Sequence, residues 1–121
     1  MAELSVQIFG HERDQATRAA IRFFKERRVA IHLVDIRRKP IARGELRRFV
    51  ERFGARGLLD EGAKAYRDQG LAYLRMDDAE IVERILAEQR LIRLPLVRFG
   101  AELAVGRDEA AWKRWFTRGG S

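Results

Sequence analysis

The sequence places four ionisable residues side by side directly before an amphipathic segment: His11, Glu12, Arg13 and Asp14. Imidazole and carboxylate groups are the usual agents of general acid–base catalysis, so an acid–base enzyme is one reading of this cluster. Adjacent residues of one loop seldom converge on a single reacting atom, and neither a nucleophile nor a metal-ligand quartet accompanies them. We therefore favour a charged surface loop.

Sulfur chemistry by this protein's own side chains is excluded, because the chain contains no cysteine. Disulfides, thiolate metal ligands and a thiol nucleophile are all ruled out with it. His32, the other histidine, lies in a segment predicted to be a strand and far in sequence from any pair of carboxylates. A structural role is typical of such a histidine, and we predict no metal site.

The elements that position the charged loop are a strand and a helix. Residues 4–8 alternate apolar and polar side chains, as a half-buried strand does, and Gly10 and His11 break the pattern. From Asp14 onward a helical period predicts an amphipathic helix whose apolar side carries Ala16, Ala20, Phe23 and Phe24. Asp14 is placed to cap the free N–H groups of the first turn. A helix start that follows a strand attracts anions, and this chain puts an aspartate there.

The following segments predict a βαβ unit and then several helices. Residues 30–36 read as a second strand, which should run parallel to the first. Residues 46–53 have helical periodicity that stops at Gly54, and residues 57–70 predict short helical turns. Asp77 and Glu80 have the spacing of a capping box before another helix.

The last third of the chain returns to strands. Residues 94–106 read as a β-hairpin whose two-residue loop, Gly100 and Ala101, suits a type II′ turn. Asp108 should cap a closing helix with an aromatic ridge at helical spacing: Trp112, Trp115 and Phe116. Helical spacing favours a core role over a base-stacking platform for that ridge. The order βαβ, helices, ββα is that of a thioredoxin-like α/β fold with a small mixed four-stranded sheet and a helical insertion between strands 2 and 3.

Length and composition predict one folded domain. At 121 residues and 46% hydrophobic residues, the chain can bury a core. We assign residues 1–118 to a single domain, with the insertion at about 41–91, and residues 119–121 to a frayed tail. No apolar run approaches the roughly 20 residues that span a bilayer, and the amino terminus lacks the features of a secretory signal. We expect a cytoplasmic protein.

The net charge of +7 is unevenly distributed. Residues 13–28 hold six basic and two acidic residues, whereas residues 60–88 hold eight acidic and four basic ones. Such a balance is compatible with nucleic acid or with an acidic partner protein. Arginines that solvate helix faces explain it equally simply, and no RNP-type aromatic motif accompanies the charge. Nucleic acid is therefore the less favoured partner.

Several segments carry a resemblance to a known family: VQIFG, TRAAIRFFKERR, KPIARGELRRFV, RGLLDEGAKAYRDQGL and AVGRDEAAWKRWF. More specific are the pattern of Leu58, Leu59, Tyr66, Gly70 and Leu71 and the run from Arg93 to Val97. In these segments the sequence resembles the ArsC/Spx family, which contains glutaredoxin-coupled arsenate reductases and Spx-type transcription regulators. The resemblance implies a thioredoxin-like fold, with Pro95 at the family's cis-proline position.

The same resemblance implies a degenerate catalytic site. Asp14 stands where the family has its nucleophilic cysteine, and Thr17 stands where Spx-like members have a second one. The family's oxyanion-binding arginines correspond here to Leu94, Asp60 and Gly106. Arg93 and Arg107 lie one residue from two of these positions and are candidate substitutes. Arg13 and Arg18, near the helix start, are further candidate binding residues.

Two function classes follow. The first is a redox-inactive binding or regulatory module with a protein partner, which resemblance to Spx would extend to the transcription machinery. The second is an enzyme of the family that uses an external thiol such as glutathione, whose carboxylates the arginines would bind. We favour the first, with no cofactor, because Asp14 cannot form a thiolate–arsenic or mixed-disulfide intermediate.

Overall fold

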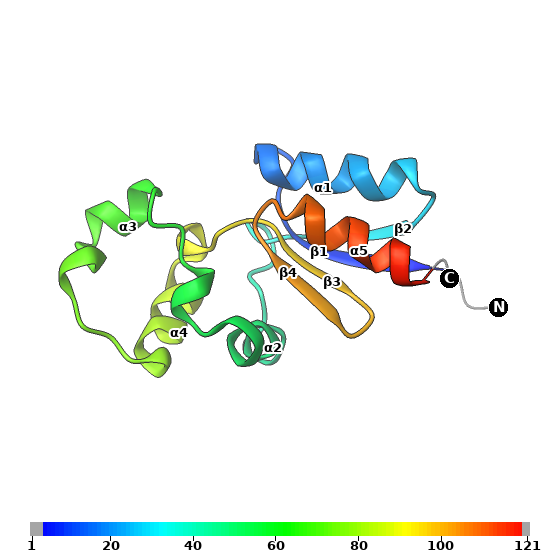
Figure 1. Ribbon diagram of the computed structural model, residues 1–121. Coiled ribbons are helices and arrows are strands. Elements are labelled where there is room, and N and C mark those ends of the chain that lie inside the picture. Colours follow the sequence, from blue (N-terminus) through cyan, green and yellow to red (C-terminus); the bar gives the residue numbers. More distant parts are fainter. Residues whose placement is uncertain (1–3, 120–121) are drawn as a thin grey trace. The chain divides into compact units, whose positions relative to one another are not determined.

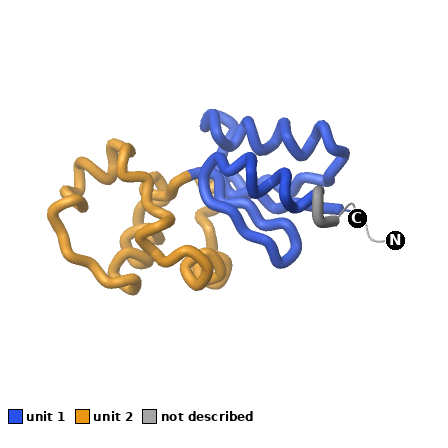
Figure 2. Tube along the Cα trace, viewed as in Figure 1, with its two compact units in different colours: residues 1–35, 94–121 blue, residues 36–93 orange. Residues whose placement is uncertain are grey.

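The computed structural model describes residues 4–119 of the chain (Figure 1). The chain divides into two compact units, one made of residues 1–35 and 94–121 and the other of residues 36–93 (Figure 2). The predicted insertion at about 41–91 falls inside the second unit. Residues 120–121, most of the predicted tail, lie outside the described residues, and Gly119 is the last residue of the closing helix.

The first unit is built on a mixed four-stranded sheet. Its strands are β1 (Ser5–Gly10), β2 (Ala30–Asp35), β3 (Leu96–Phe99) and β4 (Glu102–Val105), in the order β2-β1-β3-β4. β1 pairs with β2 in parallel, and with β3 antiparallel. β3 pairs with β4 antiparallel. The predicted α/β fold with its βαβ and ββα parts is confirmed.

The first strand runs through Gly10, one of the two residues that break its alternating pattern. Val6 and Ile8 are buried on one face of the sheet, as their alternation predicts. The strand does not stop at Ile8, because Phe9 and Gly10 continue the register opposite Val34 and Asp35 of β2. Strand pairing, rather than alternation, decides where β1 ends.

Two helices, α1 (Gln15–Glu26) and α5 (Glu109–Gly119), share one core with this sheet (Figure 1). Buried residues of α1, α5, β1, β3 and β4, together with Val29 just before β2, form a single cluster: Val6, Ile8, Ala20, Phe23, Phe24, Val29, Val97, Ala104, Ala111, Trp112 and Trp115. The ring centroid of Trp112 lies 5.4 Å from that of Phe23 and 5.8 Å from that of Phe24. Aromatic pairs at this separation are favourable, and the predicted core role of the aromatic ridge is confirmed.

The hairpin between β3 and β4 has the predicted two-residue loop. Phe99 is paired with Glu102, so that Gly100 and Ala101 form the turn. Gly100 has a φ of 60° and Ala101 does not have a positive φ, as a type II′ turn requires. Asp108 accepts a hydrogen bond from the backbone N–H of Ala111 at 3.1 Å and caps α5 as predicted.

The second unit is helical. It contains α2 (Arg43–Phe53), α3 (Lys64–Asp68) and α4 (Asp78–Ala87). A single 3₁₀ turn follows each of these helices: η1 (Arg56–Leu58) after α2, η2 (Leu71–Tyr73) after α3 and η3 (Gln89–Leu91) after α4. Gly54 directly follows the last residue of α2 and has a φ of 77°, which glycine adopts without steric strain. The predicted short turns over residues 57–70 are confirmed.

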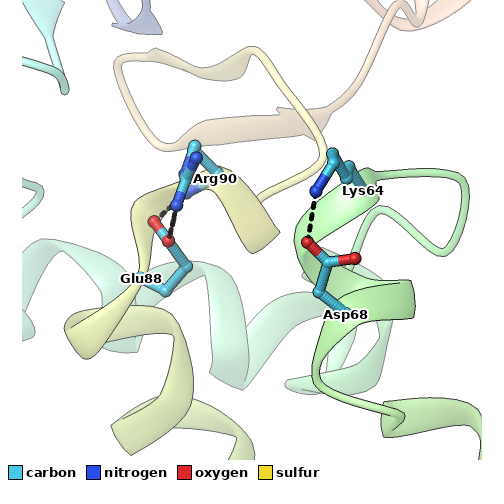
Figure 3. Close-up of polar contacts among 4 residues, drawn as sticks. All are labelled: Lys64, Asp68, Glu88 and Arg90. Carbon is cyan, nitrogen blue, oxygen red and sulfur yellow. Dashed lines mark hydrogen bonds and ion pairs between the residues drawn. The ribbon is translucent and has the colours of Figure 1, made fainter.

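Ion pairs are frequent on the surface of the helical unit. The ammonium of Lys64 lies 2.6 Å from the carboxylate of Asp68, and the guanidinium of Arg90 lies 2.5 Å from that of Glu88 (Figure 3). Arg43 and Glu83 form a third pair. In each pair the hydrogen bond to the basic partner is the main cause that lowers the pKa of the carboxyl group of Asp68, Glu83 or Glu88.

Candidate functional site

The start of α1 is capped by Asp14. Its backbone is extended, with φ −83° and ψ 125°, and it lies just before the first helical residue. Atom Oδ2 of Asp14 accepts two hydrogen bonds, one from the backbone N–H of Thr17 and one from its hydroxyl, both at 2.8 Å. The predicted capping role is confirmed. One carboxylate oxygen therefore satisfies both a backbone donor and a side-chain donor.

Thr17 is fully buried, which periodicity did not predict. The helical period places Ala16 on the apolar side of the helix, whereas Thr17 occupies the buried position and Ala16 is half-buried. A hydroxyl group is expensive to bury without a hydrogen bond, and Asp14 provides one. The sequence does contain a signal for the burial of Thr17, because Thr17, Ala20 and Phe24 follow the i, i+3, i+7 spacing of one helix face.

Gly10, at the end of β1, packs closely against Thr17. A Cβ atom at Gly10 would lie 2.3 Å from Oγ1 and 2.9 Å from Cγ2 of Thr17, far inside van der Waals contact. Only glycine leaves room for the buried threonine. We call the segment from Gly10 to Thr17 the Asp14 turn.

The ionisable side chains of the Asp14 turn differ in their exposure. Glu12 and Arg13 are exposed, and the carbonyl oxygen of His11 accepts from the backbone N–H of Asp14 at 3.1 Å. Among the described residues, Nδ1 of His11 is buried and has no hydrogen-bond partner.

The four candidate binding arginines have different surroundings. The guanidinium of Arg18 donates to the backbone carbonyl of Glu12 at 3.0 Å. The guanidinium of Arg107 lies 2.7 Å from the carboxylate of Glu109. The side chain of Arg13 is exposed, as is that of Arg93, which belongs to the helical unit and whose backbone N–H donates to Leu58. Arg18 and Arg107 are thus already engaged inside the sheet unit.

The Leu94–Pro95 peptide bond is cis, as the resemblance implies. Pro95 is buried, and its carbonyl oxygen accepts a hydrogen bond from the backbone N–H of Gly106 at 2.9 Å. Over residues 4–119, no group of three or more His, Asp or Glu residues is arranged to hold a metal ion. No helix in that same range is both long and apolar enough to cross a membrane.

Comparison with known proteins assigns the chain to a family. The model of the family described as ArsC matches residues 9–115, which include the Asp14 turn and Pro95. The chain belongs to the ArsC family. An arsenate reductase of Neisseria meningitidis serogroup A is 28% identical over 105 residues, covering 84% of this chain and 90% of that protein.

Solved structures agree on the fold of this ArsC-family chain. The YFFB (PA3664) protein has a TM-score of 0.83 at 22% identity, covering 91% of this chain and 97% of that structure. An arsenate reductase from Vibrio cholerae has a TM-score of 0.82 at 17% identity, covering 93% and 98%. At these identities the likeness shows the fold alone. The chain is therefore an arsenate reductase-like member of its family that contains no cysteine.

Proposed function

We propose that this ArsC-family chain is redox-inactive and acts in the cytoplasm as a binding or regulatory module for a protein partner. The observation that supports this most strongly is the carboxylate of Asp14, which caps α1 and holds the buried Thr17 hydroxyl. Family resemblance implies a nucleophilic sulfur at this position. The chain has no cysteine there or anywhere else.

The chemistry of Asp14 supports the proposal in two ways. A carboxylate contains no sulfur atom, so it cannot form a thiolate–arsenic bond or a mixed disulfide. It also places a negative charge at the helix start, where the free N–H groups and the helix dipole would otherwise attract an oxyanion. The site is filled by the protein's own anion.

The glutathione-dependent alternative has less support. It needs cations that are free to bind the carboxylates of the tripeptide. Two of the four candidates already have partners: Arg18 donates to Glu12, and Arg107 pairs with Glu109. Arg13 and Arg93 are the exposed candidates that remain.

A coupled assay tests the proposal. The purified chain is given arsenate or a model disulfide with glutathione, glutaredoxin, glutathione reductase and NADPH, and NADPH consumption is followed. We expect no rate above that without protein, whereas a cysteine-containing arsenate reductase must give a clear rate under the same conditions. Turnover that disappears when Asp14 or Thr17 is altered would overturn the proposal.

Titration with glutathione tests the alternative separately. We expect no heat by calorimetry and no change in the amide resonances of Thr17 or Leu96, which flank the family site. Saturable binding with shifts at both residues would support the thiol-dependent enzyme instead.

A cysteine variant tests whether position 14 is the site of the missing nucleophile. The thiol of Asp14→Cys should react with iodoacetamide at pH 6–7 faster than that of Ala87→Cys, at the end of α4. The reason is that a helix N-terminus lowers a thiol pKa and a C-terminus does not. Equal rates would contradict the assignment of this position.

A further inference from the structure

We propose that the free edge of β2 binds an extended, acidic segment of a partner protein, which adds as a further strand to the sheet. This inference rests on the proposed function, because it gives the binding module a surface and a partner chemistry. β2 is the outermost strand in the order β2-β1-β3-β4 (Figure 1). Strand addition to an exposed sheet edge is a recurrent mode of peptide recognition.

The register shows which backbone groups of β2 are available. The N–H of Ala30 donates to the carbonyl of Leu4 at 3.0 Å, so Ala30 faces β1. Alternate residues of a parallel strand bond to the same neighbour, which directs the N–H and C=O groups of Ile31 and Leu33 away from the sheet. An incoming strand would pair with these groups.

The edge of β2 carries few of the features that block strand addition, and its one acidic residue, Asp35, is its last. Native edges are usually protected by proline, lysine, bulges or short length. β2 runs in unbroken register with β1 over residues 30–35 and contains no proline, lysine or arginine. β4, the other edge strand, has only four residues, begins with Glu102 and is followed by Gly106. β2 is the longer and less protected of the two edges.

Apolar side chains lie along the same edge. Ile31 and Leu33 of β2 are half-buried and pack against the core cluster, and so does Ile21 of α1. Successive side chains of a strand point to opposite faces, so every second residue of an added strand would lie on the face that carries Ile31 and Leu33. Apolar residues at those positions would extend the core.

The charge on α1, the helix that connects β1 to β2, favours an acidic partner. A hollow of about 510 Å³ on α1 is lined by Glu12, Arg18, Ile21, Arg22 and Lys25. Arg22 and Lys25 are exposed and form no ion pair within residues 4–119. Carboxylates on the added strand would pair with them. Nucleic acid would also be attracted to the cations, but phosphates would leave the outward backbone groups of β2 unused.

Amide hydrogen exchange with synthetic peptides tests the proposal. The probe is an eight-residue peptide of alternating valine and glutamate, added to the full chain labelled with ¹⁵N. We expect exchange at Ile31 and Leu33 to slow about tenfold or more, while exchange at Leu103 and Val105 of β4 stays unchanged. Two controls should have no effect: the peptide with lysine in place of glutamate, and the acidic peptide with N-methylated backbone amides.

Charge reversal provides the matched variants. Arg22→Glu combined with Lys25→Glu should weaken peptide binding about tenfold, consistent with two exposed pairs. Arg47→Glu combined with Arg56→Glu reverses two exposed arginines of the helical unit and should leave the affinity unchanged. For the unaltered chain, raising the salt concentration from low millimolar to about 0.5 M should weaken peptide binding, because screening of the charges acts over this range.

The proposal is overturned by equal binding of the lysine peptide, by protection at β4 instead of β2, or by self-association through β2 without peptide. It is also overturned if a single-stranded oligonucleotide shifts residues around Arg22 and Lys25 while the acidic peptide protects nothing. These results are independent of the turnover assay. Arsenate turnover would refute the proposed redox-inactive function. If the peptide does not slow amide exchange at β2 and no turnover is found, only the proposed binding surface is refuted.

Discussion

Two helices in different units of the molecule begin with the same device, an aspartate cap. At α1 the carboxylate of Asp14 accepts from the N–H and the hydroxyl of Thr17. At α4 the carboxylate of Asp77 accepts from the N–H of Glu80 at 2.8 Å, and the Glu80 side chain completes a capping box. The two caps satisfy the same backbone position of the first turn.

The two starts differ in what the capped residue does. Thr17 is fully buried and lies against Gly10 of β1, whereas Asp77 and Glu80 are exposed. At α4 the cap stabilises one helix end in water. At α1 it also satisfies a hydroxyl inside the core and so couples the helix start to the sheet. Mutations should therefore cost more stability at the Asp14 turn than at the α4 cap.

The largest effect is expected for Gly10→Ala. The added Cβ would meet Oγ1 of Thr17 at 2.3 Å, in a region where neither the strand nor the buried threonine can easily move. We expect the free energy of unfolding to fall by about 3 kcal/mol, at the upper end of the overpacking range, by denaturant titration. Combining it with Thr17→Ala, which removes both Oγ1 and Cγ2, should recover part of the loss; no recovery would place the clash elsewhere.

Asp14→Ala should come next, with a loss of about 2 kcal/mol. It removes the cap and leaves the buried hydroxyl of Thr17 without its acceptor. Asp14→Asn keeps an acceptor oxygen and should cost less. If both variants were as stable as the unaltered chain, the capping role of Asp14 would be refuted.

Thr17→Val should cost about 1 kcal/mol. Shape and the backbone hydrogen bond are retained, the hydroxyl is lost, and Asp14 is partly exposed, so that water can replace the lost donor. Thermal unfolding of Thr17→Val and Asp14→Ala, alone and combined, measures their coupling. Strictly additive losses would contradict a direct Asp14–Thr17 hydrogen bond.

Asp77→Ala should cost about 0.5–1 kcal/mol, since it removes an exposed cap with no buried partner. Comparing it with Asp14→Ala under identical conditions tests the contrast between the two helix starts directly. A loss at Asp77 equal to or greater than that at Asp14 would show that burial of Thr17 adds nothing.

The smallest effect is expected from pH on the helical unit. Ion pairs lower the carboxyl pKa of Asp68, Glu83 and Glu88 below the unfolded values. A lowered pKa means that the folded chain releases the proton more readily, so the pairs stabilise it above about pH 4 and lose this effect as pH falls through the folded pKa values. Carbon-detected NMR titration should find these three midpoints below those of an unfolded reference. Midpoints at or above the reference would contradict the pairs.

Local sequence patterns determined much of the fold. The caps at Asp14, Asp77 and Asp108 and the two-residue turn at Gly100 follow from short-range chemistry, because each depends on residues within about one turn of the chain. Strand and helix types followed from periodicity for the same reason. The ends of β1 did not, because pairing with β2 sets them.

The candidate site divides in the same way. Composition alone excludes a thiol nucleophile, since no fold can supply a thiol group that the sequence lacks. Only the tertiary structure decided that Thr17 is buried and that Gly10 must lack a side chain beside it. Those properties depend on which strand and which backbone atoms come within a few ångströms of a side chain, and one-dimensional spacing does not contain that distance.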